Sequence, residues 1–247
     1  MTDLSTIAAG SADRFALWRA IASDRDVRTM AEVGVWRGAF AAAMLRDCPG
    51  IERYVMVDPW RNLDRWNKPY NVADPVFDTV MAEAMKVTGF AADRREVLRG
   101  TTREVIDRVP DGSLDLVYVD GDHTLRGITV DMVAWWPKVR PGGILGGDDL
   151  AANVWHHGLR FEPSFVFPFV INFAEAVGGR VTALGHNQFT IEKSADGSDI
   201  FSFTDLPGTY PDPSVLAQMR LRTLASALAR TWLPASLRPV LRRMLRR

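Results

Sequence analysis

Acidic residues follow two apolar runs in the middle of this chain. Asp120 comes directly after the run Leu114–Val119, with His123 three residues further on, and Asp148 and Asp149 follow a second short run flanked by glycines. Each run is typical of a buried strand, and ligands of an open parallel sheet bind at the carboxyl ends of its strands. If the two strands are neighbours, the three carboxylates converge at one edge of the sheet. Carboxylates in such proximity repel one another and need a cation.

This pattern is the outline of a metal site with a base beside it. An all-oxygen ligand set of Asp120, Asp148 and Asp149 favours Mg²⁺, with Mn²⁺ or Ca²⁺ as substitutes. A divalent cation stabilises an alkoxide, and the imidazole of His123 can accept a proton near neutral pH. The residues therefore predict activation of a hydroxyl group for attack. Two simpler roles stay open: the aspartates as N-caps of the following helices, and His123 as a hydrogen-bonded structural residue.

A turn near the N-terminus has the features of a nucleoside site. Glu32 to Gly38 lie where a strand passes into a helix; Gly34 permits a tight turn, and the helix after Gly38 can direct its amides at a polar ligand. Asp58 follows 20 residues later, at the end of the next strand, where a carboxylate can bind a ribose diol. The glycines are too few to cradle a pyrophosphate. Glu32 would repel a phosphate but attract an amine or a sulfonium.

Strand and helix patterns alternate along most of the chain. Such alternation predicts βαβ units, and hence an α/β, Rossmann-like, doubly wound sheet with helices on both faces. We expect seven strands, mostly parallel, closed by an antiparallel pair at 181–184 and 189–191. The irregular segments 59–75 and 150–168 are expected to form loops beside the site. The five parallel strands are expected at 29–35, 54–58, 96–99, 114–119 and 143–147, with helices at 11–21, 39–45, 76–86, 103–109, 127–136 and 169–177.

Composition indicates an ordinary globular protein. Of 247 residues, 47% are hydrophobic and 24% charged, and the 30 basic and 30 acidic side chains balance, so nothing favours a nucleic acid partner. The one cysteine, Cys48, excludes an internal disulfide and a cysteine-based zinc site. No apolar run approaches the ~18 residues of a membrane span, and the N-terminus lacks the pattern of a secretory signal. We therefore expect a cytoplasmic protein.

The chain changes character near residue 200. We expect the main domain, with its N-terminal helix, to cover residues 1–199, and residues 200–247 to form a linker and a basic helical extension. Eight arginines and no acidic residue follow Asp212. A basic amphipathic helix suits an anionic membrane surface, which would give a peripheral membrane contact. The alternative is packing on the core or on a second subunit, and we expect a homodimer.

The turn at Glu32–Gly38 and the strand end at Asp58 resemble motifs of the class I S-adenosylmethionine-dependent methyltransferases. This resemblance extends over roughly residues 29–193. EVGVWRG at 32–38 is similar to their first motif, VDPW at 57–60 to their ribose-binding acid, and Gly100–Thr102 to the segment that lines adenine. The resemblance implies S-adenosylmethionine as the methyl donor. The residues that it implies for binding are Glu32, Gly34, Val35, Gly38, Asp58, Thr101, Thr102 and Asp120.

Within that superfamily, residues 119–150 resemble the metal-dependent O-methyltransferases, and the macrolide-sugar group in particular, which carries an Asp-x-x-His motif and a later acidic pair. The resemblance implies Asp120, Asp148 and Asp149 as metal ligands, and His123 with Asp120 as catalytic residues. The Asp-Asp pair, in place of the Asp-Asn of catechol-type enzymes, favours the sugar-modifying branch. Leu125 stands where that branch often has tyrosine. The site also resembles that of the mycobacterial methylmannose polysaccharide methyltransferases.

The expected reaction is Mg²⁺-dependent transfer of the methyl group of S-adenosylmethionine to a hydroxyl of a sugar, glycoside or oligosaccharide. Three alternatives stay open: a phenolic acceptor, another chemistry as in the cephalosporin-hydroxylase-like proteins, and a non-catalytic partner of a membrane-associated assembly. His156 and His157 are rival bases or acceptor contacts. The expected acceptor contacts are Trp60, Arg61, Tyr70, His156 and His157.

Overall fold

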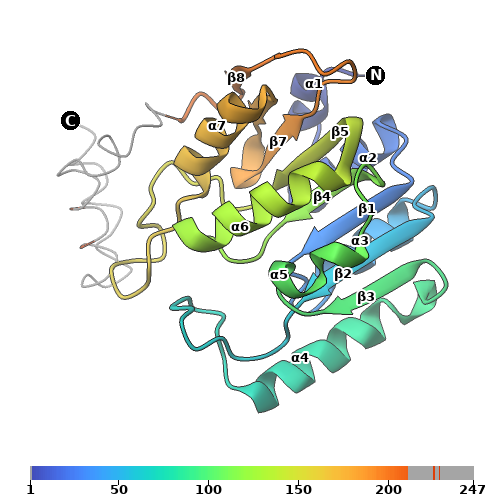
Figure 1. The fold of residues 1–247 in the computed structure, drawn as a ribbon, viewed down its shortest axis with the longest axis vertical. Helices are drawn as coiled ribbons and strands as arrows, with labels where there is room; N and C mark the ends of the chain where they lie inside the picture. The colour runs from blue at the N-terminus through green and yellow to red at the C-terminus, as the bar shows by residue number, and fades with distance from the viewer. Residues whose placement is uncertain (1, 211–224, 226–227, 229–247) are drawn as a thin grey trace.

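The computed structural model describes residues 2–210 together with 225 and 228, so the basic helices predicted between 214 and 247 lie outside the described residues but for those two. Eight strands form one sheet in the order β3-β2-β1-β4-β5-β7-β6-β8 (Figure 1). The first five run parallel, β7 lies antiparallel between β5 and β6, and β8 pairs in parallel with β6. The strands are β1 Thr29–Val33, β2 Arg53–Asp58, β3 Arg95–Arg99, β4 Leu114–Val119, β5 Val139–Gly147, β6 Arg180–Ala183, β7 Phe189–Glu192 and β8 Ser202–Asp205.

Helices cover both faces of the sheet, which confirms the predicted doubly wound α/β fold (Figure 1). One face carries α1 Leu4–Ala9, α2 Arg14–Asp24, α3 Ala39–Asp47 and α4 Asp74–Val87, and the opposite face carries α5 Thr102–Val105, α6 Leu125–Trp135 and α7 Val166–Val177. Each layer buries its own apolar cluster against the sheet, as a three-layer α/β domain requires. Short 3₁₀ turns lie at Gly89–Ala91, Ile106–Arg108, Trp136–Lys138 and Gly185–Asn187.

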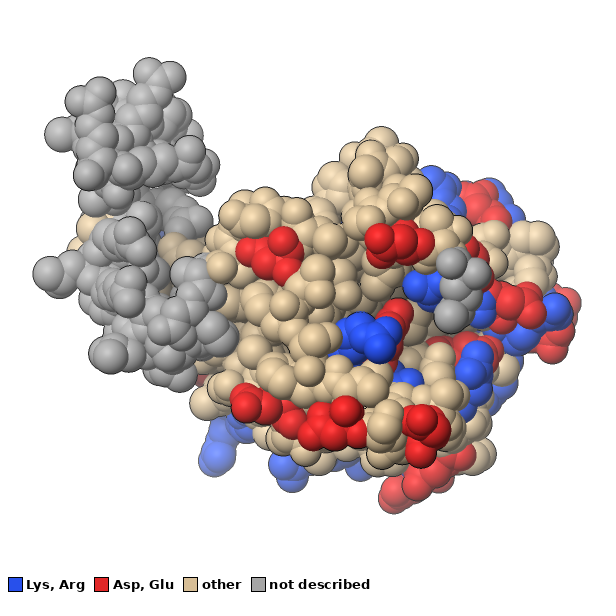
Figure 2. All heavy atoms as spheres, turned by 90° about the horizontal axis from the view of Figure 1, so that it is seen from above, with Lys and Arg blue, Asp and Glu red and all other residues tan. Residues whose placement is uncertain are grey.

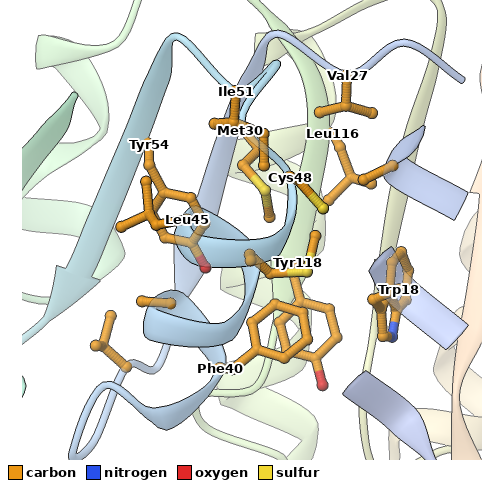
Figure 3. Packing of buried hydrophobic residues seen from close by; sticks show 14 of the residues in the cluster. Trp18, Val27, Met30, Phe40, Leu45, Cys48, Ile51, Tyr54, Leu116 and Tyr118 are labelled. Carbon is orange, nitrogen blue, oxygen red and sulfur yellow. The ribbon is translucent and has the colours of Figure 1, made fainter. Parts of the chain in front are cut away.

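Aromatic packing fixes α2 against the sheet. Trp18 of α2 is fully buried and meets Tyr118 of β4 edge to face, with ring centroids 5.1 Å apart, while Phe40 of α3 stacks on the same tyrosine at 4.0 Å (Figure 3). The helix begins at Arg14 because the Asp13 side chain accepts a hydrogen bond from the Ala16 amide at 2.8 Å, an N-cap geometry. The predicted start at Ser11 was therefore three residues too early. A helix anchored this firmly presents its first residue, Arg14, in a defined place.

One prediction about the end of the sheet was wrong. The sheet has eight strands rather than seven, and the eighth, Ser202–Asp205, lies in the segment predicted as a linker. The physical reason is that β8 is a four-residue edge strand that directs one large apolar side chain, Phe203, at the core, and so gives almost no periodic signal.

Charges of both signs are interspersed on the described surface seen in Figure 2, and neither gathers into a broad patch there. None of the helices in the described ranges combines the length and the apolar character needed to cross a bilayer.

Candidate active site

A cavity of about 460 Å³ opens at the carboxyl ends of β1 and β4. The order of the strands reverses between these two neighbours, and such a switch point is where open α/β sheets bind ligands. The volume lies within the ~300–1,000 Å³ typical of ligand pockets. Its wall contains most of the residues predicted from the first motif and from the acidic strand ends, among them Glu32, Gly34, Val35, Asp58, Thr101, Thr102, Asp120, His123, Asp148 and Asp149.

Gly34 lies in the turn between β1 and α3 and packs against the chain that follows β4. Its φ is +95°, and a Cβ atom there would lie 2.2 Å from the carbonyl oxygen of Asp120. The chain can therefore bring β1 and β4 together at this point only with glycine. Gly38, also predicted at the cofactor site, has φ +76° and caps α3, but its own close contacts are with Ala84 and Val87 of α4.

Gly34→Ala is expected to destabilise the protein by about 2–4 kcal/mol, because both the positive φ and the collision with Asp120 act against it. Gly112→Ala is the matched control, since Gly112 has φ +64° and no atom within 4 Å of a built Cβ. The control should lose only about 1–2 kcal/mol, the cost of the left-handed conformation. Urea unfolding of the two variants measures both losses, and equal losses would contradict the close-packed turn.

Asp58 organises the cofactor turn from the end of β2. Its Oδ2 accepts hydrogen bonds from the amides of Val35 and Trp36 at 3.0 and 2.9 Å, and its Oδ1 accepts one from the Trp60 amide at 2.8 Å. A carboxylate has about four lone-pair sites, so three amides leave one for a ribose hydroxyl. Burial raises the pKa of Asp58, while the three amides oppose that shift. The residue therefore has a structural role besides the predicted binding role.

Glu32 is a buried carboxyl group at the cavity. Only 1% of it is exposed, and the hydroxyl of Tyr54 donates to its Oε2 at 2.6 Å. Burial raises the pKa of Glu32 well above its usual range. A positively charged ligand would restore the carboxylate, which suits the amine or sulfonium predicted for this position.

The far end of the cavity contains a second buried acid. Thr101 and Thr102 follow β3, and the Thr102 hydroxyl donates to Asp131 of α6 at 2.6 Å. Burial raises the pKa of Asp131 to about 7. Sequence reasoning missed Asp131, although its spacing from Ile128 and Trp135 places it on the buried face of the helix and would have revealed it.

His123 and Asp149 form a hydrogen-bonded pair at the base of the cavity. His123 Nδ1 lies 2.7 Å from Asp149 Oδ2, and His123 Nε2 is buried without a hydrogen-bond partner among the described residues. The same carboxylate oxygen lies 3.3 Å from His156 Nε2 and 3.9 Å from His157 Nε2. Burial favours protonation of Asp149, but the imidazoles outweigh it and hold its pKa well below the usual range. The Asp149 carboxylate therefore faces three imidazoles, those of His123, His156 and His157.

Asp120 and Asp148 face a different cation. Arg14 Nη1 lies 3.1 Å from Asp120 Oδ2 and also contacts Asp148 Oδ2. The three predicted carboxylates line one cavity, but Asp120 and Asp148 share a guanidinium, whereas Asp149 contacts imidazoles. Within the described residues, the potential ligand atoms within 4.8 Å of one another belong to Asp149, His156 and His157. One oxygen with two nitrogens suits transition metals better than Mg²⁺.

The predicted acceptor contacts divide into two groups. Tyr70 and His157 line the cavity, and His156 reaches Asp149. Trp60 does not line the cavity, because it is fully buried and its indole N–H donates to the Trp36 carbonyl at 2.9 Å. Arg61 also lies outside the lining, because its guanidinium pairs with Glu104 at 2.7 Å on the surface.

The two irregular segments meet beside the cavity. Lys68, 6% exposed, donates to the Glu162 carbonyl at 2.9 Å and to the Ser164 hydroxyl at 2.7 Å. The Asn67 amide donates to the Arg160 carbonyl at 3.2 Å. These bonds hold the segment after β2 against the segment after β5, so the loops predicted beside the site form one wall.

Residues 31–150 match the profile of a protein family described as a methyltransferase domain. An uncharacterized protein of Sinorhizobium fredii, y4gI, is 27% identical over 120 residues. That match covers 45% of this chain and 13% of the relative, so the chain corresponds to a small part of that protein.

Solved structures share the fold. A candidate caffeoyl-CoA O-methyltransferase from Staphylococcus aureus has a TM-score of 0.54 at 12% identity, covering 78% of this chain and 93% of that one. The O-methyltransferase TomG from Streptomyces achromogenes, involved in tomaymycin synthesis and solved in complex with S-adenosylmethionine, has a TM-score of 0.50 at 18% identity, covering 78% and 91%. This chain therefore has the α/β, Rossmann-like fold of these O-methyltransferase structures, and its residues 31–150 are similar to a methyltransferase domain.

Proposed function

We propose that this protein transfers the methyl group of S-adenosylmethionine to a hydroxyl of a sugar, glycoside or oligosaccharide, with His123 as the general base. The observation that carries the proposal is the His123–Asp149 pair at the cavity. Asp149 fixes Nδ1 at 2.7 Å, and Nε2 has no hydrogen-bond partner among the described residues. A base oriented by a carboxylate with its other nitrogen free is suited to accept a proton from a bound hydroxyl.

The chemistry needs one proton transfer and one displacement. An alcohol is a weak nucleophile, so His123 Nε2 takes the hydroxyl proton as the oxygen–carbon bond forms. The methyl donor supplies an activated carbon, whose bond to sulfur breaks with its electron pair left on sulfur. Alignment of oxygen, carbon and sulfur by the cavity wall supplies much of the remaining acceleration. Glu32 stabilises the positive charge of the donor at the turn after β1.

The wall formed by the segment after β2 supports the acceptor class. Trp66, Tyr70 and Leu63 offer apolar surface, and Lys68 and His157 offer polar groups beside it. Aromatic faces with flanking polar groups suit a pyranose ring. The same rings favour a phenolic acceptor as a second candidate: Trp36 and Tyr70 meet edge to face with centroids 5.5 Å apart beside the cavity. The Staphylococcus aureus protein of similar fold is described as a candidate caffeoyl-CoA O-methyltransferase.

The magnesium ion predicted from the sequence is not part of this proposal, because Arg14 lies between Asp120 and Asp148, and Asp149 contacts imidazoles.

The first test is calorimetric titration of S-adenosylhomocysteine, followed by labelled-methyl transfer to panels of saccharides and of phenols. We expect micromolar binding and labelling of a saccharide. Labelling of phenols alone would replace the acceptor class and keep the reaction. Binding without labelling of either panel, together with capture of the protein by liposomes, would instead support the non-catalytic partner.

A further inference from the structure

Converging carboxylates need a cation, and the structure places one between Asp120 and Asp148. Arg14 Nη1 is 3.1 Å from Asp120 Oδ2 and contacts Asp148 Oδ2 as well. The two aspartates end β4 and follow β5, whereas Arg14 opens α2, more than a hundred residues earlier. A guanidinium is protonated at every pH at which proteins fold, so this positive charge is permanent.

Three of the four acceptor sites of the Asp148 carboxylate are occupied. Its Oδ1 accepts hydrogen bonds from the Gln188 side-chain amide at 2.6 Å and from the Asp149 backbone amide at 2.7 Å. Its Oδ2 is taken by Arg14. Gln188 is itself fully buried and held by Trp18 and Tyr118, whose donors lie 2.8 and 3.1 Å from its Oε1. The orientation of Asp148 is therefore set by the core.

Arg14 is presented by a rigid element. It is the first residue of α2, next to the N-cap Asp13, and Trp18 one turn later is fully buried against Tyr118 (Figure 3). The Arg14 side chain is 32% exposed and lines the cavity. Both carboxylates contact its Nη1, so the guanidinium joins the ends of two neighbouring strands.

A bound Mg²⁺ ion would have to displace Arg14 from Asp120 and Asp148. It demands near-octahedral oxygen ligands at about 2.0–2.1 Å, but Asp148 Oδ1 already accepts two hydrogen bonds, Asp148 Oδ2 contacts Arg14, and Asp149 Oδ2 faces His123 and His156. We propose that Arg14 supplies within the chain the positive charge that holds Asp120 and Asp148 together, so that methyl transfer at this site needs no divalent cation. The proposal deepens the proposed function and rests on it for the reaction. Arg14 is a positioning residue that replaces a metal ion.

The test compares the wild type, Arg14→Gln and Arg14→Lys in cation binding and in methyl transfer. Wild-type protein is expected to show no saturable heat with Mg²⁺ or Mn²⁺ at up to millimolar concentration, and less than a twofold change in rate in EDTA. Arg14→Gln removes the charge, so it is expected to bind Mg²⁺ or Mn²⁺ saturably and to lose at least tenfold in rate, part of which the cation restores. Arg14→Lys keeps a charge and should need no added cation.

The control on the same helix is Arg19→Gln, which breaks only the surface pair between Arg19 and Asp47. It should bind no Mg²⁺ and keep the wild-type rate. Stoichiometric Mg²⁺ binding by the wild type, or loss of its activity in EDTA with recovery on adding Mg²⁺, would overturn the proposal. Cation binding to the wild type is decisive even if Arg14→Gln does not fold. If no variant transfers methyl groups while S-adenosylhomocysteine still binds, the proposed function fails, and the cation titrations still decide the role of Arg14.

Discussion

Replacing His123 with asparagine is expected to lower the rate of methyl transfer by about 10²–10⁴-fold, the usual contribution of a general base. The affinity for S-adenosylhomocysteine should change by less than twofold, because the variant removes a proton acceptor and leaves the turn at Gly34 and Asp58 intact. Single-turnover transfer of labelled methyl groups, with calorimetry of the same preparations, measures both quantities.

His186→Asn is the matched control. His186 lies in the exposed turn before β7 with φ +61°, a conformation that asparagine tolerates well. Its side chain lies away from the cavity, so the rate should stay unchanged. A His123→Asn variant that kept more than a tenth of the wild-type rate would show that another group, such as His157, is the base.

The pH dependence follows from the same pair. Burial lowers the pKa of His123, but the hydrogen bond to Asp149, together with the negative charges of Asp149, Asp120 and Asp148, outweighs burial and raises the pKa to about 9. A base must be unprotonated to act, so the rate should rise up to tenfold per pH unit from neutrality and level off near pH 9. Asp149→Asn removes the charge that raises the pKa, and the plateau should therefore begin at lower pH. A rate independent of pH between 7 and 9 would contradict the assignment.

Glu32→Gln is expected to weaken binding of S-adenosylmethionine by about 10–100-fold, since a charge-assisted contact contributes roughly 1.5–3 kcal/mol. Glutamine keeps an oxygen for the Tyr54 hydroxyl, so the core should be little disturbed. S-adenosylhomocysteine lacks the sulfonium charge and should lose less affinity. Competition titrations with both ligands give the two factors, and equal losses would show that Glu32 does not sense the charge on sulfur.

Wild-type protein should also release a proton when it binds the positively charged S-adenosylmethionine. Burial raises the pKa of Glu32 in the free protein well above its usual range, whereas a neighbouring positive charge lowers it. Below the raised pKa, binding therefore expels a proton, and affinity increases with pH. Above this pKa, the Glu32 carboxyl group is already ionised in the free protein, so the affinity no longer changes with pH. Calorimetry in buffers of different ionisation heat counts the protons, and Glu32→Gln should release fewer.

The sequence predicted the sheet and several of the residues that line the cavity, because those features are local. Apolar runs such as Leu114–Val119 are bounded by turn residues and carry their own signal, and the strand occurs at the residues predicted. Gly34, Asp58 and Asp120 each stand directly after such a run, so the rule that strand ends share one edge places them together.

The errors came from contacts between distant parts of the chain. Nothing near Arg14 indicates that it meets Asp148, which lies 134 residues later. Gln188 orients Asp148 across the sheet, and no spacing rule connects the two. Carboxylates predicted to share one ion are divided because a basic side chain and three imidazoles compete for them. The role of Trp60 was mistaken because an aromatic residue after a strand suits a binding surface as well as a core position, and only packing distinguishes the two.

Asp149 has φ +59°, in the left-handed region that few residues other than glycine, asparagine and aspartate enter readily. The backbone therefore narrows the choice at this position to side chains that are almost the same in shape and differ in charge. Aspartate and asparagine codons differ by one base. Evolution can thus exchange the partner of His123 for a neutral amide in a single step without rebuilding the turn, and so retune the strength of the base as the acidity of a new acceptor demands.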